Sequence, residues 1–257
     1  MTETLSRIAK EVGNLFREGY SASKEVTYKG SVDLVTQYDL QIELLLKEKL
    51  RDAFPGYTLI GEETTEAIVH AEKAIYIDPI DGTTNFVHGI PFCAISIGLF
   101  EQGRPQAAVV YLPILDELFR AEAGHGAFLN GEPLRVGNAD TLEKSLMATG
   151  FPYTKVERGA DFEWVLKTMR ALLPCTRDIR RLGSASVDLC YVARGTFEGF
   201  YETNLKPWDV AAGWLIVEEA GGRVSKEDGT PYTIGDHIIV ATNGRIHDAL
   251  VEKLGAS

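Results

Sequence analysis

The chain contains 257 residues, with 26 basic and 37 acidic side chains, so its formal net charge is −11 with histidine neutral. Hydrophobic residues make up 45% and charged residues 25%, a composition typical of globular proteins with a sizeable core. This composition excludes disordered and collagen-like chains, and the length predicts between one and two domains.

Several classes of protein are disfavoured by what the sequence lacks. No run approaches the ~18 apolar residues that cross a bilayer, and the first residues contain no hydrophobic signal region, so we expect a cytoplasmic protein without membrane contact. Cys93, Cys175 and Cys190 are odd in number and widely spaced, which indicates buried reduced thiols rather than disulfides or a zinc site. An acidic chain without a Lys or Arg cluster also makes a nucleic-acid partner unexpected.

The first half of the chain begins with helical patterns and continues with short apolar runs. Apolar residues at helical spacing predict helices over residues 4–20 and from about 38 to 51. Short runs bounded by turns predict strands at 57–60, 74–77, 92–100, 106–112 and 117–121. Brief turns separate the last three, which favours antiparallel pairing. Asn130-Gly131 predicts a hairpin between residues 127–129 and 133–136.

After about residue 140, helical patterns alternate with single strands. Helices are predicted at 161–172, 186–193, 210–220 and 245–254, and strands at 197–201 and 237–241. The fold class is therefore mixed α/β. We expect one compact unit over residues 1–257, with a cleft between an N-terminal lobe of about 1–140 and a C-terminal lobe of about 141–257.

The most informative stretch is Asp78-Pro79-Ile80-Asp81, which follows the apolar residues of a predicted strand. Pro79 fixes the backbone φ angle and removes a donor, so the chain can turn and aim both carboxylates and the Ile80 carbonyl toward one point. All three are hard oxygen ligands of the kind that Mg²⁺ prefers. The stretch therefore predicts a magnesium site at the end of the strand.

Gly82-Thr83-Thr84 follows directly and suits a phosphate group. Gly82 permits close approach of the backbone, and the three successive amides could line up as donors, as at a helix N-terminus that holds a phosphate. A carboxylate cage beside such amides is the arrangement that a metal-bridged phosphate ester requires.

Other acidic residues stand at the ends of predicted elements. Glu62-Glu63 follows the strand at 57–60, and Asp209 opens the helix at 210–220. Taken singly, each has an ordinary structural explanation: Glu62-Glu63 as a solvated loop, Asp209 as an N-cap, and Asp-x-x-Asp as a turn. Thr36-x-x-Asp39 is likewise a capping-box pattern. Their combination is more specific, because converging carboxylates repel one another and need cations.

The order of these motifs closely resembles the inositol monophosphatase family. The resemblance lies in Gly-Glu-Glu at 61–63, Asp-Pro-Ile-Asp-Gly-Thr-Thr-Asn-Phe at 78–86, and Trp-Asp at 208–209 followed by Ala-Ala-Gly, and it runs from about Lys29 to Gly222 and beyond. It implies a layered α-β-α-β-α sandwich of the inositol monophosphatase/fructose bisphosphatase type that is commonly a homodimer. The form Leu-Lys-Pro-Trp-Asp is similar to bacterial members.

The resemblance also implies roles for individual residues. Two or three Mg²⁺ ions would be bound by Glu62, Asp78, the Ile80 carbonyl, Asp81 and Asp209. Thr83, paired with Asp39, would orient and help deprotonate the attacking water, while Glu62 would act through a metal-bound water. Lys29 matches a family lysine near the active-site loop.

The predicted substrate contacts extend to a run of small residues and a further carboxylate. The resemblance implies that the turn Gly183-Ser184-Ala185 contacts the polyol and that Glu202 accepts its hydroxyl protons. Tight helix packing explains the small residues equally well. Arg180 and Arg181 could reach an anionic substrate or be solvated. The complete predicted substrate set is Glu62, Ile80, Asp81, Gly82, Thr83, Arg180, Gly183, Ser184, Ala185, Glu202 and Asp209.

The sequence thus predicts a magnesium-dependent phosphomonoesterase that hydrolyses myo-inositol monophosphate through a metal-activated water. No covalent nucleophile is expected, since G-x-S-x-G, Walker A and H-E-x-x-H motifs are all absent from the sequence. Related enzymes with the same metal motif act on fructose bisphosphate, phosphoadenosine phosphate or histidinol phosphate, and lithium inhibition is a family trait. The alternative from another class is a non-catalytic regulatory or interaction protein on the same fold.

Overall fold

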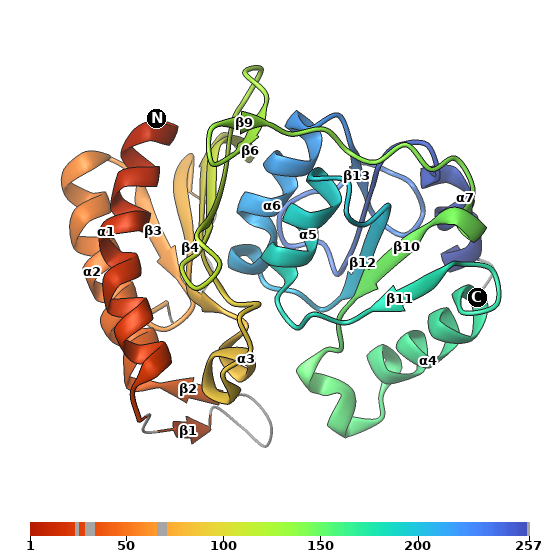
Figure 1. Cartoon of the computed structure of the whole chain (residues 1–257), viewed down its shortest axis with the longest axis horizontal. Coiled ribbons are helices and arrows are strands. Elements are labelled where there is room, and N and C mark those ends of the chain that lie inside the picture. Colours follow the sequence, from red (N-terminus) through yellow and green to blue (C-terminus); the bar gives the residue numbers. More distant parts are fainter. Residues whose placement is uncertain (24–25, 29–33, 66–70, 256–257) are drawn as a thin grey trace.

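Helices and strands alternate in five layers across the computed structural model, which describes residues 1–23, 26–28, 34–65 and 71–255 (Figure 1). A helix pair lies at one side, followed by a large sheet, a second helix pair, a smaller sheet and a third helix pair. This order confirms the predicted α-β-α-β-α sandwich. None of the helices in the described ranges is long and apolar enough to cross a membrane.

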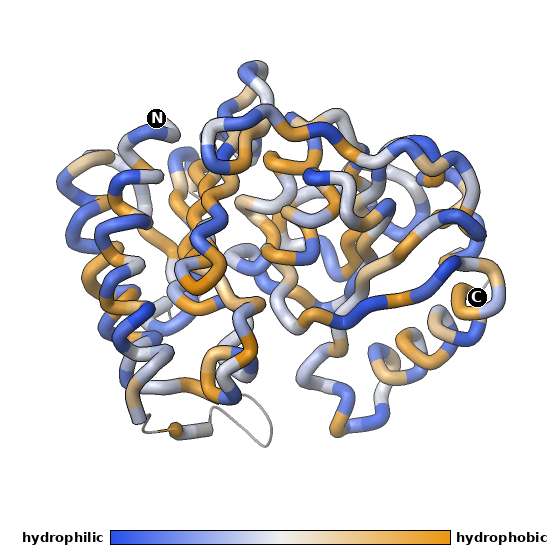
Figure 2. The backbone as a smooth tube through the Cα atoms, viewed as in Figure 1, coloured by the Kyte–Doolittle hydropathy of each residue, from blue (hydrophilic) through white to orange (hydrophobic). Residues whose placement is uncertain are grey.

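The first layer contains α1 (Thr2–Ser21) and α2 (Gln37–Ala53), close to the predicted bounds. Leu5, Val12 and Phe16 lie on one face of α1 and are fully buried, because helical spacing brings them together above β6 and β7 of the neighbouring sheet. The opposite face is solvated, which gives the alternation of blue and orange along this helix in Figure 2.

The larger sheet follows the chain in order. Its strands are β3 (Thr58–Gly61), β4 (Lys73–Asp81), β5 (Ala94–Glu101), β6 (Arg104–Leu112), β7 (Glu117–Glu122), β8 (Ala127–Leu129) and β9 (Glu132–Pro133). β3 and β4 are parallel, and all later neighbours are antiparallel, as predicted for the middle strands. Asn130 and Gly131 connect β8 to β9 with positive φ angles of 50° and 93°, which confirms the hairpin.

β4 is longer than predicted. The sequence predicted a strand at 74–77 followed by a turn, whereas the strand continues through Pro79 to Asp81, with an irregularity in its pairing with β5 between Asp78 and Asp81. Pro79 has no N–H, so the ladder is interrupted there without ending the strand. The Ile80 amide donates instead to Asp78 Oδ1 at 3.0 Å. The irregularity places two carboxylates at the end of a buried strand.

The middle layer consists of α5 (Ala185–Ala193) and α6 (Pro207–Glu219). α6 contacts β5 and β6 on one side and β13 on the other, so almost its whole circumference is apolar (Figure 2). Gly98 on β5 permits this packing, since a Cβ there would lie 2.9 Å from the Ala211 backbone. α6 also begins three residues earlier than predicted, so Asp209 is the third residue of the helix rather than its N-cap.

The smaller sheet has the order β11-β10-β12-β14-β13. Its strands are β10 (Leu146–Thr149), β11 (Asp178–Arg180), β12 (Gly199–Thr203), β13 (Arg223–Ser225) and β14 (Ile238–Thr242). β10, β11 and β12 are parallel, and the other pairs are antiparallel. The sequence predicted β12 and β14 but missed β10, β11 and β13, because three or four residues give too little periodicity. α4 (Ala160–Leu172) and α7 (His247–Gly255) form the last layer.

A few short elements complete the described part of the chain. β1 (Val26–Tyr28) pairs antiparallel with β2 (Leu34–Thr36), α3 (Thr83–His88) follows β4, and 3₁₀ turns lie at Leu142–Lys144 and Tyr153–Glu157. None of these was predicted. The three cysteines are free, as expected, although Cys175 is only half-buried.

Candidate active site

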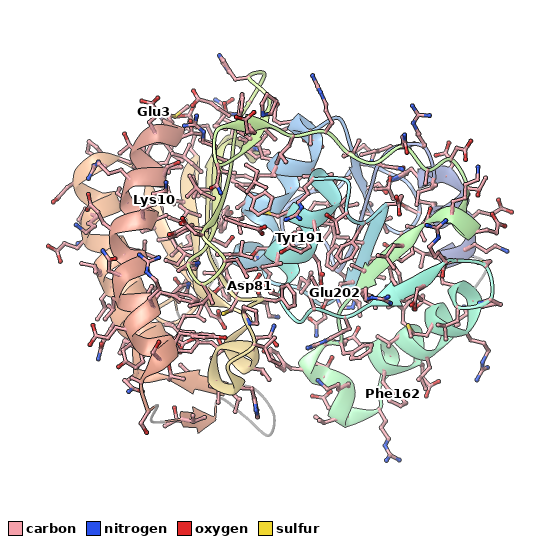
Figure 3. The ribbon with its side chains drawn as sticks, viewed as in Figure 1. Glu3, Lys10, Asp81, Phe162, Tyr191 and Glu202 are labelled. Atoms are coloured by element: carbon pink, nitrogen blue, oxygen red, sulfur yellow. The ribbon has the colours of Figure 1, made fainter. Side chains whose placement is uncertain are left out.

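A cavity of about 250 Å³ lies where the ends of β4, α5 and α6 meet the segment after β10. In Figure 3, Asp81 and Glu202 lie near each other in the middle of the molecule, one from β4 and the other from β12. The lining brings together the following predicted residues: Glu62, Asp81, Gly82, Gly183, Ser184, Ala185, Glu202 and Asp209. Residues far apart in the sequence therefore share one site.

Four other predicted residues are buried and do not appear in the lining of this cavity. Asp39, Asp78 and Thr83 are 1%, 2% and 8% exposed, and Ile80 is 1% exposed. β4 and α3 connect three of them directly to Asp81, which does line the cavity. Lys29 lies outside the described residues.

The carboxylates around the end of β4 are close enough to repel one another. Burial raises the pKa of Asp78 well above its ordinary value, and the negative charge of Glu62 raises it further. The charges of Asp81, Asp209 and Asp39 act on Asp78 in the same direction. The pKa of Asp209 is also raised well above its ordinary value, by burial and then by Asp81. Such a group is unfavourable without compensating positive charge.

Hydrogen bonds hold two of these carboxylates in place. Asp81 Oδ2 accepts from the Ser184 hydroxyl and from the Ser186 amide, both at 2.7 Å. Asp209 Oδ2 accepts from the Lys206 amide at 2.7 Å, so the first turn of α6 fixes its direction. These hydrogen bonds join the start of α5 to Asp81 at the end of β4. The small residues at 183–186 permit this close approach, so they have a packing role, and residues 183–185 also line the cavity.

Thr83 and Asp39 form the predicted pair. Thr83 Oγ1 lies 3.0 Å from Asp39 Oδ1 and 3.0 Å from the Ile80 carbonyl oxygen, so its single proton can donate to either acceptor. Asp39 Oδ2 accepts from the Thr36 amide at 2.8 Å and from its hydroxyl at 2.6 Å. The capping box at the start of α2 is therefore present, and the same carboxylate uses its other oxygen for Thr83.

The chemistry of these oxygen atoms fits a hard divalent cation. Within the described ranges, no three His, Cys, Asp or Glu side chains already stand in the arrangement of a metal site. However, Asp78, Asp81 and Asp209 are carboxylates with raised pKa values, each raised first by burial, in an acidic group. A hard cation would offset both the burial and the mutual repulsion of these charges. The residues present thus fit magnesium.

Glu202 also lines the cavity. It is 7% exposed, and burial raises its pKa to about 8, although the Arg181 guanidinium lowers it. Gly150 makes room for this carboxylate, because a Cβ at that position would lie 2.0 Å from both Glu202 oxygens. A buried carboxyl group at a cavity wall suits recognition of a hydroxyl-bearing ligand.

The two neighbouring arginines, Arg180 and Arg181, lie in different environments. Arg180 is exposed on β11 and forms an ion pair with Asp178 at 2.5 Å, and it does not line the cavity. Arg181 does line the cavity, with its guanidinium 5.6 Å from the centre of the Phe151 ring. Successive side chains of an extended segment point to opposite sides, which places Arg180 away from the cavity and Arg181 against it.

Three buried polar residues that the sequence did not single out also hold or line the site. Glu43 is fully buried on α2 and accepts from the Glu63 amide at 2.7 Å and the Thr64 amide at 3.1 Å, so it holds the segment that carries Glu62. Asn85 donates to the carbonyl oxygens of Phe92 and Leu182 at 2.6 and 2.8 Å.

Asp188, the third such residue, lies on α5 and lines the cavity. The only sequence signals for these positions were a buried Glu in an apolar helical stripe, an Asn inside the strongest motif, and an Asp within an apolar helix.

Comparison with known proteins agrees with the motifs. A model described as "Inositol monophosphatase family" matches residues 1–257. Inositol monophosphatase 2 of Solanum lycopersicum is 42% identical over 255 residues, which are 97% of this chain and 96% of that protein. Nus factor SuhB of Escherichia coli is 39% identical over 251 residues, 96% and 93% of the two chains.

A solved structure gives the same assignment. The IMPase of Thermotoga maritima superposes with a TM-score of 0.89 at 33% identity, covering 99% of this chain and 96% of that one. A family model matches the whole chain, relatives match it over nearly their full length, and a solved member has the same layered fold. These findings agree on one family. The chain belongs to the inositol monophosphatase family and is a phosphomonoesterase.

Proposed function

We propose that this protein is a magnesium-dependent phosphatase that hydrolyses myo-inositol monophosphate to myo-inositol and phosphate. The observation that carries the proposal is the cavity itself, whose lining brings Asp81 and Asp209 of the acidic group together with the buried Glu202. The acidic group suits a metal-bound phosphate, and Glu202 suits the hydroxyl groups of the alcohol that leaves.

The metal ligands would be Glu62, Asp78, the Ile80 carbonyl, Asp81 and Asp209, with two or three ions. When bound, Mg²⁺ polarises the phosphoryl oxygens, makes a bound water more acidic and stabilises the leaving alkoxide.

The remaining work falls to the chain's own residues. Thr83 Oγ1 directs its proton toward Asp39 at 3.0 Å, so its lone pairs can accept a hydrogen bond from the attacking water and orient it. Glu62 acts on the same water. The amides of residues 82–84 would donate to the phosphate oxygens, because the left-handed conformation of Gly82, with φ of 90°, starts α3 directly after β4. Glu202 and the turn at 183–185 would hold the polyol.

Other phosphate esters are the substrate alternatives, since the metal chemistry is common to fructose bisphosphate, phosphoadenosine phosphate and histidinol phosphate. The names of two solved relatives illustrate the range: one called SaIMPase-II, 26% identical, holds inositol monophosphate, and an IMPase/NADP phosphatase, 25% identical, holds NADP and Ca²⁺. The buried Glu202 favours a polyol, because an ester without hydroxyl groups would leave this carboxyl group without a partner.

The deciding experiment is phosphate release from these four substrates with and without Mg²⁺. We expect the highest kcat/KM for inositol monophosphate, no activity after exhaustive chelation, and recovery on adding Mg²⁺. Asp81→Asn should lower kcat more than about a hundredfold while preserving the far-UV circular dichroism spectrum. A preference for another ester would overturn the substrate assignment, and activity that survives chelation would overturn the metal-dependent mechanism.

A regulatory role is the second candidate, and the name "Nus factor SuhB" of the relatives from Escherichia coli and Salmonella typhimurium favours testing it. A non-catalytic protein would show no phosphate release from any ester, and its cellular phenotype would be unaffected by Asp81→Asn. If the protein acts as an enzyme, Asp81→Asn should by itself abolish the cellular phenotype.

The remaining proposals concern the state of the protein in solution and in the cell. We propose a cytoplasmic homodimer that is inhibited by millimolar lithium and has neither a nucleic-acid nor a membrane partner. Light scattering tests the dimer, and full activity in millimolar lithium with saturating Mg²⁺ would contradict the inhibition.

A further inference from the structure

Asp188 is a further buried carboxylate in the cavity wall, and none of the roles above employs it. It lies on α5 one turn after Ser184, is 1% exposed and lines the same cavity as Glu202. Its Oδ1 is buried and has no hydrogen-bond partner among the residues that the structure describes. A buried polar oxygen without a donor is destabilising, so natural proteins rarely retain one without a reason.

The donors nearest along the chain are already committed. The Ser186 amide donates to Asp81 Oδ2, the Val187 amide lies 3.4 Å from Ser184 Oγ, and the Asp188 amide donates to the Ser184 carbonyl at 3.0 Å. The amides of residues 186–188 therefore supply no donor to the Asp188 side chain, and the Ser186 hydroxyl is likewise buried without a partner among the described residues. Asp188 lines the cavity, so a hydroxyl group of a ligand bound there could supply the donor for this side chain.

The charges around Asp188 come from three other segments. Burial raises its pKa well above the ordinary value, and the negative charges of Glu202 on β12 and Asp81 on β4 raise it further, whereas the Arg181 guanidinium lowers it. Asp188 and Glu202 thus form a pair of buried carboxyl groups in the lining of the cavity. Arg181 partly offsets their charge.

We propose that Asp188 is a specificity-determining residue that, together with Glu202, binds two hydroxyl groups of the alcohol portion of the substrate. This inference rests on the proposed phosphatase function. A ligand with several neighbouring hydroxyls can donate to both carboxyl groups, whereas an ester with one hydroxyl or none leaves at least one of them buried without a partner. The pair therefore selects polyhydroxylated phosphate monoesters.

Asp188→Asn tests the proposal, because it keeps the shape of the side chain and replaces one acceptor oxygen by an NH₂ group. Two substrates are compared in the intact protein: inositol 1-phosphate, which carries ring hydroxyls, and p-nitrophenyl phosphate, which carries none. We expect KM for inositol 1-phosphate to rise roughly tenfold with kcat within about twofold, and kcat/KM for p-nitrophenyl phosphate to stay within about twofold. The matched control is Asp248→Asn, an exposed aspartate on α7.

The ratio of the two kcat/KM values is the decisive quantity, since the fraction of folded protein cancels from it. An unchanged ratio would overturn the proposal, whether both activities fall together through displacement of Asp81 or neither changes. If the wild-type protein hydrolyses p-nitrophenyl phosphate but not inositol phosphates, the proposed substrate is wrong. The proposed role of Asp188 is then wrong as well. A reduced ratio in an active wild-type background supports Asp188 specifically.

Discussion

At the scale of single residues, the site depends on the missing side chain of one glycine as well as on the side chains that line the cavity. Gly150 contributes nothing to the cavity except space, yet Glu202 occupies that space with both carboxylate oxygens. Since Glu202 is buried, it has little freedom to move elsewhere.

Gly150→Ala should displace the Glu202 carboxylate, because the new Cβ would lie 2.0 Å from its oxygens. We expect KM for inositol monophosphate to rise roughly tenfold, while hydrolysis of p-nitrophenyl phosphate changes little. Steady-state kinetics with both substrates measure this. Gly159→Ala is the control, since a Cβ there meets no atom within 4 Å. Equal kinetics for Gly150→Ala and wild type would contradict this arrangement of Glu202.

His247 is the residue whose titration should be visible in stability. It is fully buried, with ring nitrogens 2.8 Å from Ser225 Oγ and 2.9 Å from Thr242 Oγ1, and burial lowers its pKa to about 4. The folded state therefore keeps His247 neutral, whereas the unfolded chain binds a proton below about pH 6.5. The stability contributed by this group is complete above pH 6.5 and is lost progressively as the pH falls toward 4.

We expect His247 to account for a loss of about 2 kcal/mol in the free energy of unfolding between pH 7 and pH 5. Urea unfolding of wild type and His247→Gln at both pH values measures it. Gln cannot gain a proton, so the variant should show a smaller loss over that interval. An identical loss in both proteins would assign the pH dependence to other groups.

At the scale of elements, α2 positions two different parts of the site. Its first turn presents Asp39 to Thr83, and one turn later Glu43 holds the segment after β3 through the amides of residues 63 and 64. The Lys47 ammonium group, 3.0 Å from Glu43, partly offsets the buried charge. A movement of this segment would move Glu62, so Glu43 is a positioning residue for the proposed metal site.

Glu43→Gln should loosen the segment that carries Glu62, because an amide provides one acceptor where the carboxylate provides two. We expect the Mg²⁺ concentration for half-maximal activity to rise about three- to tenfold, with a smaller change in kcat at saturating Mg²⁺. Activity titrations with Mg²⁺ measure this. Glu48→Gln, at an exposed position on the same helix, should leave the titration unchanged. Matching titrations for both variants would exclude the positioning role.

At the scale of the whole molecule, α5 and α6 join the two sheets. One buried cluster contains Tyr76 and Phe100 of the larger sheet, Trp214 of α6, and Phe200 and Ile239 of the smaller sheet. Neither sheet can bury its inner face without these helices. This supports the proposal that residues 1–257 fold as one unit, with the two lobes sharing a core.

We therefore expect a single unfolding transition in urea. Tryptophan fluorescence should report mainly on the middle layer, since Trp208 and Trp214 lie on α6, and far-UV circular dichroism reports on every helix. The two curves should coincide with one midpoint. Separate midpoints would indicate that the lobes unfold independently, and would contradict the single unit.

Much of the fold follows from patterns that short stretches of sequence carry. The amphipathic stripe of residues 4–20, the Asn130-Gly131 turn and the uniformly apolar run after Asp209 each specify an element, because periodicity and turn preference act between near neighbours. The motif at 78–86 likewise indicated its chemistry. β10, β11 and β13 escaped prediction, since their strand conformation depends on pairing with distant strands.

The tertiary structure alone decided which side chains meet. Arg181 rather than Arg180 lines the cavity, and Glu43, Gly150 and Asp188 gain their proposed roles only from neighbours 20 to 52 residues away or from the cavity itself. The sequence determined the family, the layered fold and the acidic motifs. The packing of α5 and α6 between two sheets determined the geometry of the site, because burial and close contact arise only when distant segments come together.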